Sequence, residues 1–200
     1  MTASFSFSQD PFKNFEIIFQ KAQDQNLKDP NAMFLSTCSE QAVSSVRTVL
    51  YKGMVRGGFS FYTNYESQKS QEILKTKRAS TLFFWAPMET QIGISGIVEK
   101  LTVAESEAYF KIRPRMSQIG AWASHQSQKI KSLEELEARA KEFEKKFAGQ
   151  EVPCPKHWGG FHILPLKIEF WFGRVGRMHE RYIYERESVA APWQTYMKAP

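Results

Sequence analysis

The order of strands and helices is the feature of this sequence that most limits its fold. Stretches rich in Phe, Tyr and β-branched residues predict a first block of strands at 29–38, 43–52, 59–63, 79–86 and 90–102. After a helical block, further strands are predicted at 161–164, 167–174, 179–185 and 193–197. Because the strands do not alternate with long helices, a doubly wound parallel sheet is disfavoured. The pattern favours a mainly β fold, an antiparallel barrel with helices packed outside it.

Within the first block, the turn "GMVRGG" at 53–58 joins strand 43–52 to strand 59–63, which predicts a hairpin between these two strands. The apolar strand 79–86 is expected to be central in the sheet.

Two patterns concern single strands. Gly93 and Gly96 predict a bend or bulge in their strand. In the stretch "WFGRVGRMHERYIYER", strand alternation would place Arg177, His179 and Arg181 on one face. Three neighbouring cations fit either a solvated edge strand, an anion site or a nucleic-acid surface.

Helices are predicted at 10–25, at 66–77, over 103–130 with a break at Pro114, and at 132–149. Asp10 is expected to cap the first helix, with Pro11 at its first position. Ser132 and Glu135 are expected to form a capping box at the start of the last helix, 132–149. Its predicted buried stripe comprises Leu133, Leu136, Ala140, Phe143 and Phe147, with Gly149 ending the helix.

The length of 200 residues indicates a single domain over 1–200, with residues 1–9 as a flexible N-terminal arm. The start of the sequence lacks the features of a signal peptide, and no apolar run approaches the ~20 residues of a membrane span.

Cys38 and Cys154 show no pattern, which favours free thiols in a reduced, cytoplasmic setting. The net charge of +6 suits an anionic partner, but the basic residues are scattered, which argues against nucleic acid.

Several standard sites are absent from the sequence. It contains no phosphate-binding P-loop, no dinucleotide-binding glycine motif and no G-x-S-x-G elbow. The four histidines and two cysteines lack the spacing of metal ligands, so no metal is expected.

Four short clusters gather basic, hydroxyl and amide groups, at 47–52, 61–70, 109–122 and 124–129. In the second cluster, a helix N-terminus that carries Ser67 and Lys69 is a typical phosphate-binding site. In the third, Tyr109, Arg113 and Ser117 follow one another at intervals of four and can hold a phosphate dianion. Taken singly, each cluster also fits ordinary protein surface.

Taken together and in order, these clusters resemble the pyridoxamine 5′-phosphate oxidase family. The resemblance rests on "RTVLYK", "FYTNYESQKSQEIL", "LFFWAPMETQIGISGIVEKL", "YFKIRPRMSQIGAWASHQS", "VPCPKHWGGFHILPLKIEFWFG" and "RMHERYIYER", and it runs from about Asp10 to the C-terminus. It implies an antiparallel split β-barrel and a homodimer that holds flavin mononucleotide (FMN) at its subunit interface. The implied activity is oxidation of pyridoxamine or pyridoxine 5′-phosphate by O2 to pyridoxal 5′-phosphate, with H2O2 as a product and NH3 from the amine.

The resemblance also implies roles for individual residues. Matching FMN-binding positions are Arg47, Thr48, Val49, Leu50, Tyr51, Lys52, Tyr62, Thr63, Gln68, Lys69, Gln91, Gln126, Ser127, Trp171 and Arg181. The positions that match the holders of the substrate phosphate are Lys52, Tyr109, Arg113 and Ser117. Arg177 and His179 match the catalytic pair that binds and covers the substrate ring.

The sequence departs from the family pattern at a few positions. Gln68 stands where the family usually has Arg, Met116 where it often has an acidic residue, and Tyr51 where it usually has Leu. Two alternatives to the implied function stay open. One is a flavin-barrel relative that oxidises another ring, such as a phenazine precursor, and the other is a carrier of FMN or pyridoxal phosphate without turnover.

Overall fold

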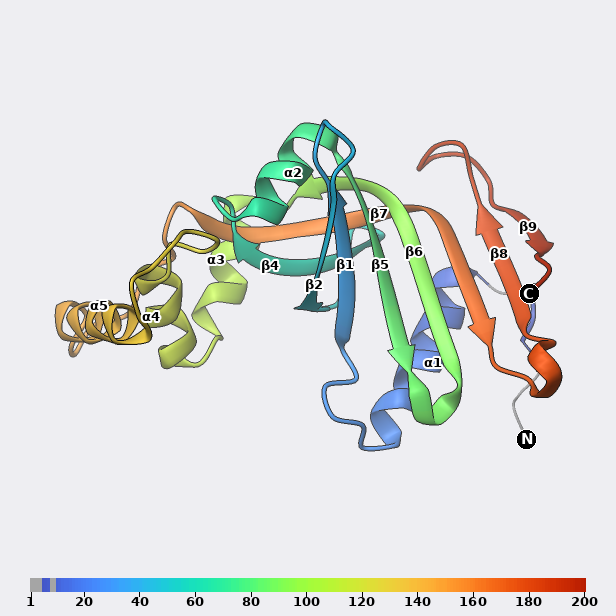
Figure 1. Ribbon diagram of the computed structural model, residues 1–200, viewed down its shortest axis with the longest axis horizontal. Coiled ribbons are helices and arrows are strands. Elements are labelled where there is room, and N and C mark those ends of the chain that lie inside the picture. The colour runs from blue at the N-terminus through green and yellow to red at the C-terminus, as the bar shows by residue number, and fades with distance from the viewer. Residues whose placement is uncertain (1–4, 8–9) are drawn as a thin grey trace.

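The computed structural model describes residues 5–7 and 10–200. A strand-rich body fills its centre, with α3, α4 and α5 gathered at one end and β8 and β9 at the other (Figure 1). The predicted flexible arm, 1–9, falls largely outside the described residues. Phe5 and Phe7 are described, and their rings pack on Tyr182 with centroids 4.4 and 5.2 Å away.

The strands of the described residues form one antiparallel sheet, as the sequence predicts. In the order β2-β1-β5-β6-β7-β4-β3, each strand pairs with its neighbours, while β8 pairs with β7 and β9. The strands are β1 (Ala32–Cys38), β2 (Ser44–Leu50), β3 (Met54–Val55), β4 (Gly58–Asn64), β5 (Arg78–Trp85), β6 (Thr90–Lys100), β7 (Trp158–Phe172), β8 (Glu180–Glu185) and β9 (Gln194–Met197). The predicted central position of 79–86 is confirmed, because β5 lies between β1 and β6.

The sheet closes into a barrel just after β2. The amide of Lys52 donates to Ser60 O at 2.9 Å, and the amide of Ser60 donates to Gly53 O at 3.0 Å. The predicted hairpin between 43–52 and 59–63 is therefore wrong, since β2 pairs with β1 along its whole length and β3 is the hairpin partner of β4. The chain turns away after β2 at Gly53, whose φ of +96° is a conformation that glycine adopts readily.

β7 is one continuous strand, not the two predicted at 161–164 and 167–174. Its residues 161–172 border β6, while its first half pairs with β4 and its second half with β8. The register shifts between Ser95 and Gly96, opposite Pro165, so a bulge accommodates the proline without ending the strand. The bulge predicted from the glycines is confirmed at Gly96, although its extra residue, Leu166, lies in the paired strand β7.

α1 (Pro11–Asp24) packs its apolar face on the barrel core. Asp10 caps it as predicted, with its carboxylate accepting from the amide of Phe12 at 2.8 Å. Phe15 is fully buried, and its ring centroid lies 4.8 Å from that of Phe59 and 5.2 Å from that of Phe83. Rings from α1, β4 and β5 thus form one hydrophobic core.

The remaining α-helices are α2 (Gln68–Thr76), α3 (Val103–Lys111), α4 (Arg115–Ala123) and α5 (Leu133–Lys146), and short 3₁₀ turns lie at Ala86–Met88 and Val175–Arg177. The predicted break at Pro114 is confirmed, because this proline is the residue that precedes α4. No helix of the described ranges is long and apolar enough to cross a membrane.

α5 differs from its prediction in two respects. Ser132 accepts from the amide of Glu135 as expected, but the Glu135 carboxylate accepts from the amide of Lys131, so only half of the capping box forms. None of its residues is buried, and Leu133 is 63% exposed. The helix lies at the far end of the molecule beside α4 (Figure 1), where Ala140 and Phe143 of its stripe pack on neighbouring side chains but stay partly exposed. Only Phe147, just beyond its end, is buried.

Candidate functional site

A cavity of about 550 Å³ opens between the end of β2, β4, the start of α2 and the α3–α4 corner. It brings together many of the residues predicted for a site: Thr48, Val49, Leu50, Lys52, Tyr62, Thr63, Lys69, Tyr109, Arg113, Ser117 and Gln126. A larger cavity of about 1000 Å³, lined by Phe110, Arg115 and Cys154 among others, contains none of them. The predicted residues, not size, therefore identify the candidate site.

At one end of this cavity a buried ammonium lies among neutral partners. Lys69 is 8% exposed, and its Nζ donates to Gln126 Oε1 at 2.6 Å, to Ser67 Oγ at 2.9 Å and to Thr63 Oγ1 at 3.2 Å. Burial, together with the nearby positive charge of Arg47, lowers the pKa of Lys69 to about 8. A buried cation that no carboxylate hydrogen-bonds has capacity for an anionic ligand.

The start of α2 contributes to the same end. The amide of Gln68 donates to Ser127 Oγ at 3.2 Å, so the loop after α4 docks on the helix N-terminus. The Gln68 side chain turns to Glu72 instead, with Nε2 donating to Oε1 at 2.9 Å. Helix N-termini favour anions because their first amides lack intrahelical partners.

Arg47 does not line the cavity. Its guanidinium donates to Thr37 Oγ1 at 2.6 Å and lies 3.9 Å from the Glu72 carboxylate. Burial alone would raise the pKa of Glu72, but hydrogen bonds from Thr37, Gln68 and Ser45 outweigh it and lower that pKa. Burial also lowers the pKa of Arg47. The contacts of Arg47 and Glu72 join α2 to β1 and β2, so Arg47 lies behind the residues that line the cavity.

A second cationic end is formed by α3, α4 and the segment after β2. Lys52 Nζ lies 5.9 Å from the centroid of the Tyr109 ring. The guanidinium carbon of Arg113 lies 4.6 Å from the centroid of Trp158, and its Nη1 is buried without a hydrogen-bond partner among the described atoms. Burial lowers the pKa of Arg113. With Ser117 on the same cavity wall, these groups match the predicted phosphate holders.

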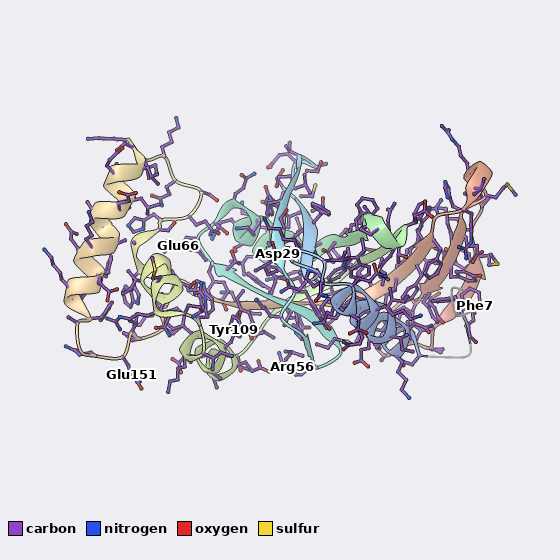
Figure 2. The ribbon with its side chains drawn as sticks, turned by 90° about the horizontal axis from the view of Figure 1, so that it is seen from below. Phe7, Asp29, Arg56, Glu66, Tyr109 and Glu151 are labelled. Carbon is purple, nitrogen blue, oxygen red and sulfur yellow. The ribbon has the colours of Figure 1, made fainter. Side chains whose placement is uncertain are left out.

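Tyr51 does not line the cavity, because its ring is buried in the barrel core, 5.4 Å from that of Phe15. The predicted residues of β6, β7 and β8 lie at the opposite end of the sheet. Gln91, Trp171 and Arg181 follow one another in register across β6, β7 and β8. Trp158 borders the cavity at the start of β7, and Trp171 lies near its end, so about 40 Å of strand separates them. Figure 2 shows the same separation, with Tyr109 beside the helices and Phe7, which packs on β8, at the far side.

The predicted row of three cations on one strand face is wrong. Arg177 belongs to the 3₁₀ turn before β8 with a φ of +61°, so it is not in a strand. His179 packs on Trp171, with ring centroids 4.6 Å apart, and its Nδ1 accepts from the amide of Arg174 at 3.1 Å. Arg181 forms an ion pair with Glu169, at 2.7 Å from Nε to Oε1, which offsets the expected repulsion.

The sequence reasoning gave no role to several cavity residues, of which Trp158 is the largest. The stretch "HWGGF" contains one signal that could have pointed to Trp158. Two glycines after an aromatic residue in a strand indicate that other groups approach the strand backbone closely.

The outer face of β1, β2 and β5 is unusually apolar. Phe34, Val46, Leu50 and Phe84 are each between 42% and 69% exposed. The register Phe34↔Thr48 and Phe34↔Leu82 places them on one side of the sheet, because alternate residues share a face. Apolar patches of this kind mark interfaces.

Comparison with known families gives two matches that together span most of the chain. Residues 19–147 match the family model described as pyridoxamine 5′-phosphate oxidase. Residues 158–200 match the model described as the pyridoxine 5′-phosphate oxidase C-terminal dimerisation region, which fits a homodimer.

Curated relatives agree with these models. A pyridoxine/pyridoxamine 5′-phosphate oxidase of Bdellovibrio bacteriovorus is 45% identical over 196 residues, covering 98% of this chain and 100% of the relative. One from Leptospira biflexa is 48% identical over 179 residues, covering 90% of this chain and 84% of the relative.

Solved structures share the fold. The structure of PhzG from Burkholderia lata in complex with tetrahydrophenazine-1-carboxylic acid has a TM-score of 0.92 at 27% identity and covers 100% of this chain and 99% of its own. A pyridoxamine 5′-phosphate oxidase-related, FMN-binding protein from Nostoc punctiforme has a TM-score of 0.77 at 13% identity, covering 96% of this chain and 99% of its own. The second likeness concerns the split-barrel fold alone.

Proposed function

This chain belongs to the pyridoxamine 5′-phosphate oxidase family of FMN-dependent oxidoreductases, and on that premise we propose which reaction it catalyses and how. It oxidises pyridoxamine 5′-phosphate and pyridoxine 5′-phosphate to pyridoxal 5′-phosphate, with O2 reduced to H2O2, in the synthesis or salvage of vitamin B6. With the amine substrate, water is consumed and NH3 is released. One observation carries the proposal: a single cavity has two cationic ends, Lys69 at one and Lys52 with Arg113 at the other. Two phosphorylated ligands side by side require such an arrangement.

FMN fits the first end. Within the described residues, the hydrogen-bond partners of the Lys69 ammonium are all neutral, and the N-terminus of α2 adds its dipole. Lys69, Thr63, Gln126 and Ser127 would hold the cofactor phosphate, and Thr48–Leu50 would lie along the ring system. When bound, FMN would supply the redox chemistry, namely the uptake of a hydride equivalent from the substrate carbon and the transfer of its electrons to O2.

The second end fits the substrate phosphate. Lys52, Tyr109, Arg113 and Ser117 supply a cation, a phenol, a guanidinium and a hydroxyl on one wall. The unpartnered Arg113 Nη1 is the donor that most needs an anionic acceptor.

The remaining site residues come from a second subunit. Gln91, Trp171, Arg177, His179 and Arg181 lie too far along the sheet to reach the cavity of their own chain. A homodimer that pairs through the apolar face of β1, β2 and β5 and through the C-terminal region would bring them to the partner's cavity. FMN would then lie at the subunit interface.

Arg177 and His179 orient the substrate ring by proximity. Because Nδ1 of His179 accepts a hydrogen bond from the Arg174 amide, the neutral ring carries its proton on Nε2. His179 therefore presents an Nε2–H donor to the ligand. We assign no obligatory general base.

A specific observation supports a second candidate, since PhzG, whose structure holds a tetrahydrophenazine carboxylic acid, superimposes over the whole chain. The presence of all four predicted phosphate holders favours a phosphorylated substrate instead. A carrier without turnover is the third possibility.

The two free cysteines favour a reduced compartment, so we place the enzyme in the cytoplasm.

A spectroscopic experiment tests the function. Flavin bands of the purified protein should bleach anaerobically with pyridoxamine 5′-phosphate and return with air. Unphosphorylated pyridoxamine should bleach them far more slowly. If a dihydrophenazine carboxylate bleached the bands and pyridoxamine 5′-phosphate did not, the second candidate would be favoured. If none of these substrates bleached the bands, the protein would be a carrier.

A further inference from the structure

We propose that Trp158 is a positioning residue that holds the Arg113 guanidinium in place before the substrate phosphate arrives. The inference deepens the proposed function and rests on it, because it takes the Lys52–Arg113 end of the cavity as the substrate phosphate site. No role for Trp158 follows from the sequence motifs alone.

Three rings with nearly parallel planes lie beside the cavity. Tyr62 is 4.0 Å from Tyr109 between centroids, with 19° between the planes, and 5.5 Å from Trp158, with 12° between the planes. Arg113 lies over the Trp158 ring at 4.6 Å. A cation on the face of a tryptophan is attracted by the ring quadrupole, and a planar guanidinium stacks well there.

Trp158 is itself held from several sides, so it can serve as a fixed support. It is 7% exposed and pairs with Asn64 across β4 and β7. The Phe110 ring meets it edge-on at 5.0 Å. Gly160, opposite Tyr62, leaves room for the three rings, since an added Cβ there would come within 2.8 Å of Tyr62 Cε1.

The way Arg113 is held matters for anion binding. Arginine has many rotamers, and a free guanidinium loses that freedom when a ligand binds. A carboxylate partner would orient it but would also repel a phosphate and occupy its donors, as Glu72 and its neighbours do for Arg47. A ring face orients the guanidinium and leaves Nη1 without a hydrogen-bond partner in the described part of the chain. Trp158 thus supplies orientation without competing charge.

The test compares Trp158→Leu and Trp158→Phe with Trp122→Phe. Trp122 is a matched control because it belongs to the same helical end, packs on Phe143 and Phe147 and does not line the site cavity. Calorimetry on the FMN-loaded protein measures binding of pyridoxal 5′-phosphate and of unphosphorylated pyridoxal. Steady-state kinetics with pyridoxamine 5′-phosphate then separates KM from kcat.

Trp158→Leu should weaken binding of the phosphorylated ligand about tenfold, with about threefold loss for Trp158→Phe, as expected for a cation–π contact of this kind. KM should rise in parallel while kcat stays within about twofold. Binding of pyridoxal and the behaviour of the Trp122→Phe control should not change. An equal loss for both ligands, or no loss, would overturn the proposal.

Two further readouts keep the outcome clear. If Trp158→Leu fails to fold, the test rests on Trp158→Phe, which keeps a ring in the core. The ratio of its affinities for pyridoxal 5′-phosphate and for pyridoxal, compared with the wild-type ratio, then decides whether the proposal holds. If the wild-type protein binds pyridoxal 5′-phosphate but does not oxidise pyridoxamine 5′-phosphate, the proposed function fails. The binding ratio then still tests the role of Trp158.

Discussion

Nζ of Lys69 lies 2.6 Å from Oε1 of Gln126, and this hydrogen bond ties the first turn of α2 to the loop that follows α4. The two residues are 57 positions apart in sequence. The contact brings a buried ammonium to one end of the candidate site and surrounds it with neutral groups. Several predictions about cofactor binding and catalysis depend on this arrangement.

The pH dependence of FMN binding should report on Lys69. Its pKa is lowered from 10.5 to about 8, so between these values the ligand-free native state binds fewer protons than the unfolded chain. The free energy of unfolding of the ligand-free protein should therefore rise with pH across that window. A phosphate favours the ammonium, so FMN binding should take up a proton above pH 8 and weaken as pH rises.

Calorimetry at about pH 9 in two buffers of different ionisation enthalpy measures this proton uptake. Lys69→Arg is the control, because a guanidinium stays charged at that pH. Equal proton uptake in the variant and the wild type would contradict the assignment to Lys69.

Gln68→Arg should raise FMN affinity by roughly tenfold, the scale of one charge-assisted hydrogen bond. The new guanidinium would lie at the N-terminus of α2 with Glu72 one turn away as its support. A fluorescence titration of released FMN measures the change. Gln71→Arg adds the same charge at an exposed position of the same helix and should have little effect. A similar gain in both variants would point to net charge instead.

Arg177→Leu should lower kcat/KM about 100-fold, because substrate misplacement of about 1 Å costs on that order. Flavin content should stay close to that of the wild type, since Arg177 is assigned to the substrate. Arg174→Leu is a control in the same turn, where the guanidinium is already paired with Glu180 at 2.7 Å. Parallel loss of flavin and turnover in Arg177→Leu would refute the assigned role.

Mixed dimers test whether each site uses two subunits. Arg113→Ala and Arg177→Leu chains should each be nearly inactive alone, yet their heterodimer regains one intact site out of two. Because half of randomly mixed dimers are heterodimers, co-expression should restore about a quarter of wild-type activity. Absence of any restoration would place both residues in one chain's site.

Gly96→Ala should destabilise the protein by at least about 2 kcal/mol, because the β7 backbone at the bulge opposite Gly96 leaves no room for a methyl group. An added Cβ would lie 2.0 Å from Leu164 O, a backbone atom that cannot turn aside. Gly93→Ala in the same strand is the control, since its Cβ would meet its nearest neighbours at 3.9 Å. Denaturant unfolding curves compare the two, and equal losses would contradict the steric reason.

Three predictions that depend on a few neighbouring residues were confirmed. Asp10 caps α1, Pro114 separates α3 from α4, and Gly96 lies at a bulge. In each case the backbone torsions and short-range hydrogen bonds of the residue itself determine the outcome. The mainly β, antiparallel fold also followed from the order of the strands.

Predictions that depend on distant partners were less successful. The predicted strand 43–52 does not pair with 59–63, because its pairing with β1 is a long-range choice that its own residues do not reveal. Leu133 was expected to be buried, yet α5 lies at the edge of the molecule. Arg177 lies in a turn, so the alternation of a strand does not apply to it.

Residue patterns along the chain predict the fold class, the family and the residue types that can hold two phosphates. The folded chain is needed to show that Lys69, Arg113 and Gln126 border one cavity, while Trp171 and Arg181 lie near the far end of β7. This is because residue type and spacing act over a few positions along the chain. The convergence of distant side chains is decided by strand pairing, barrel closure and core packing, which involve the whole molecule.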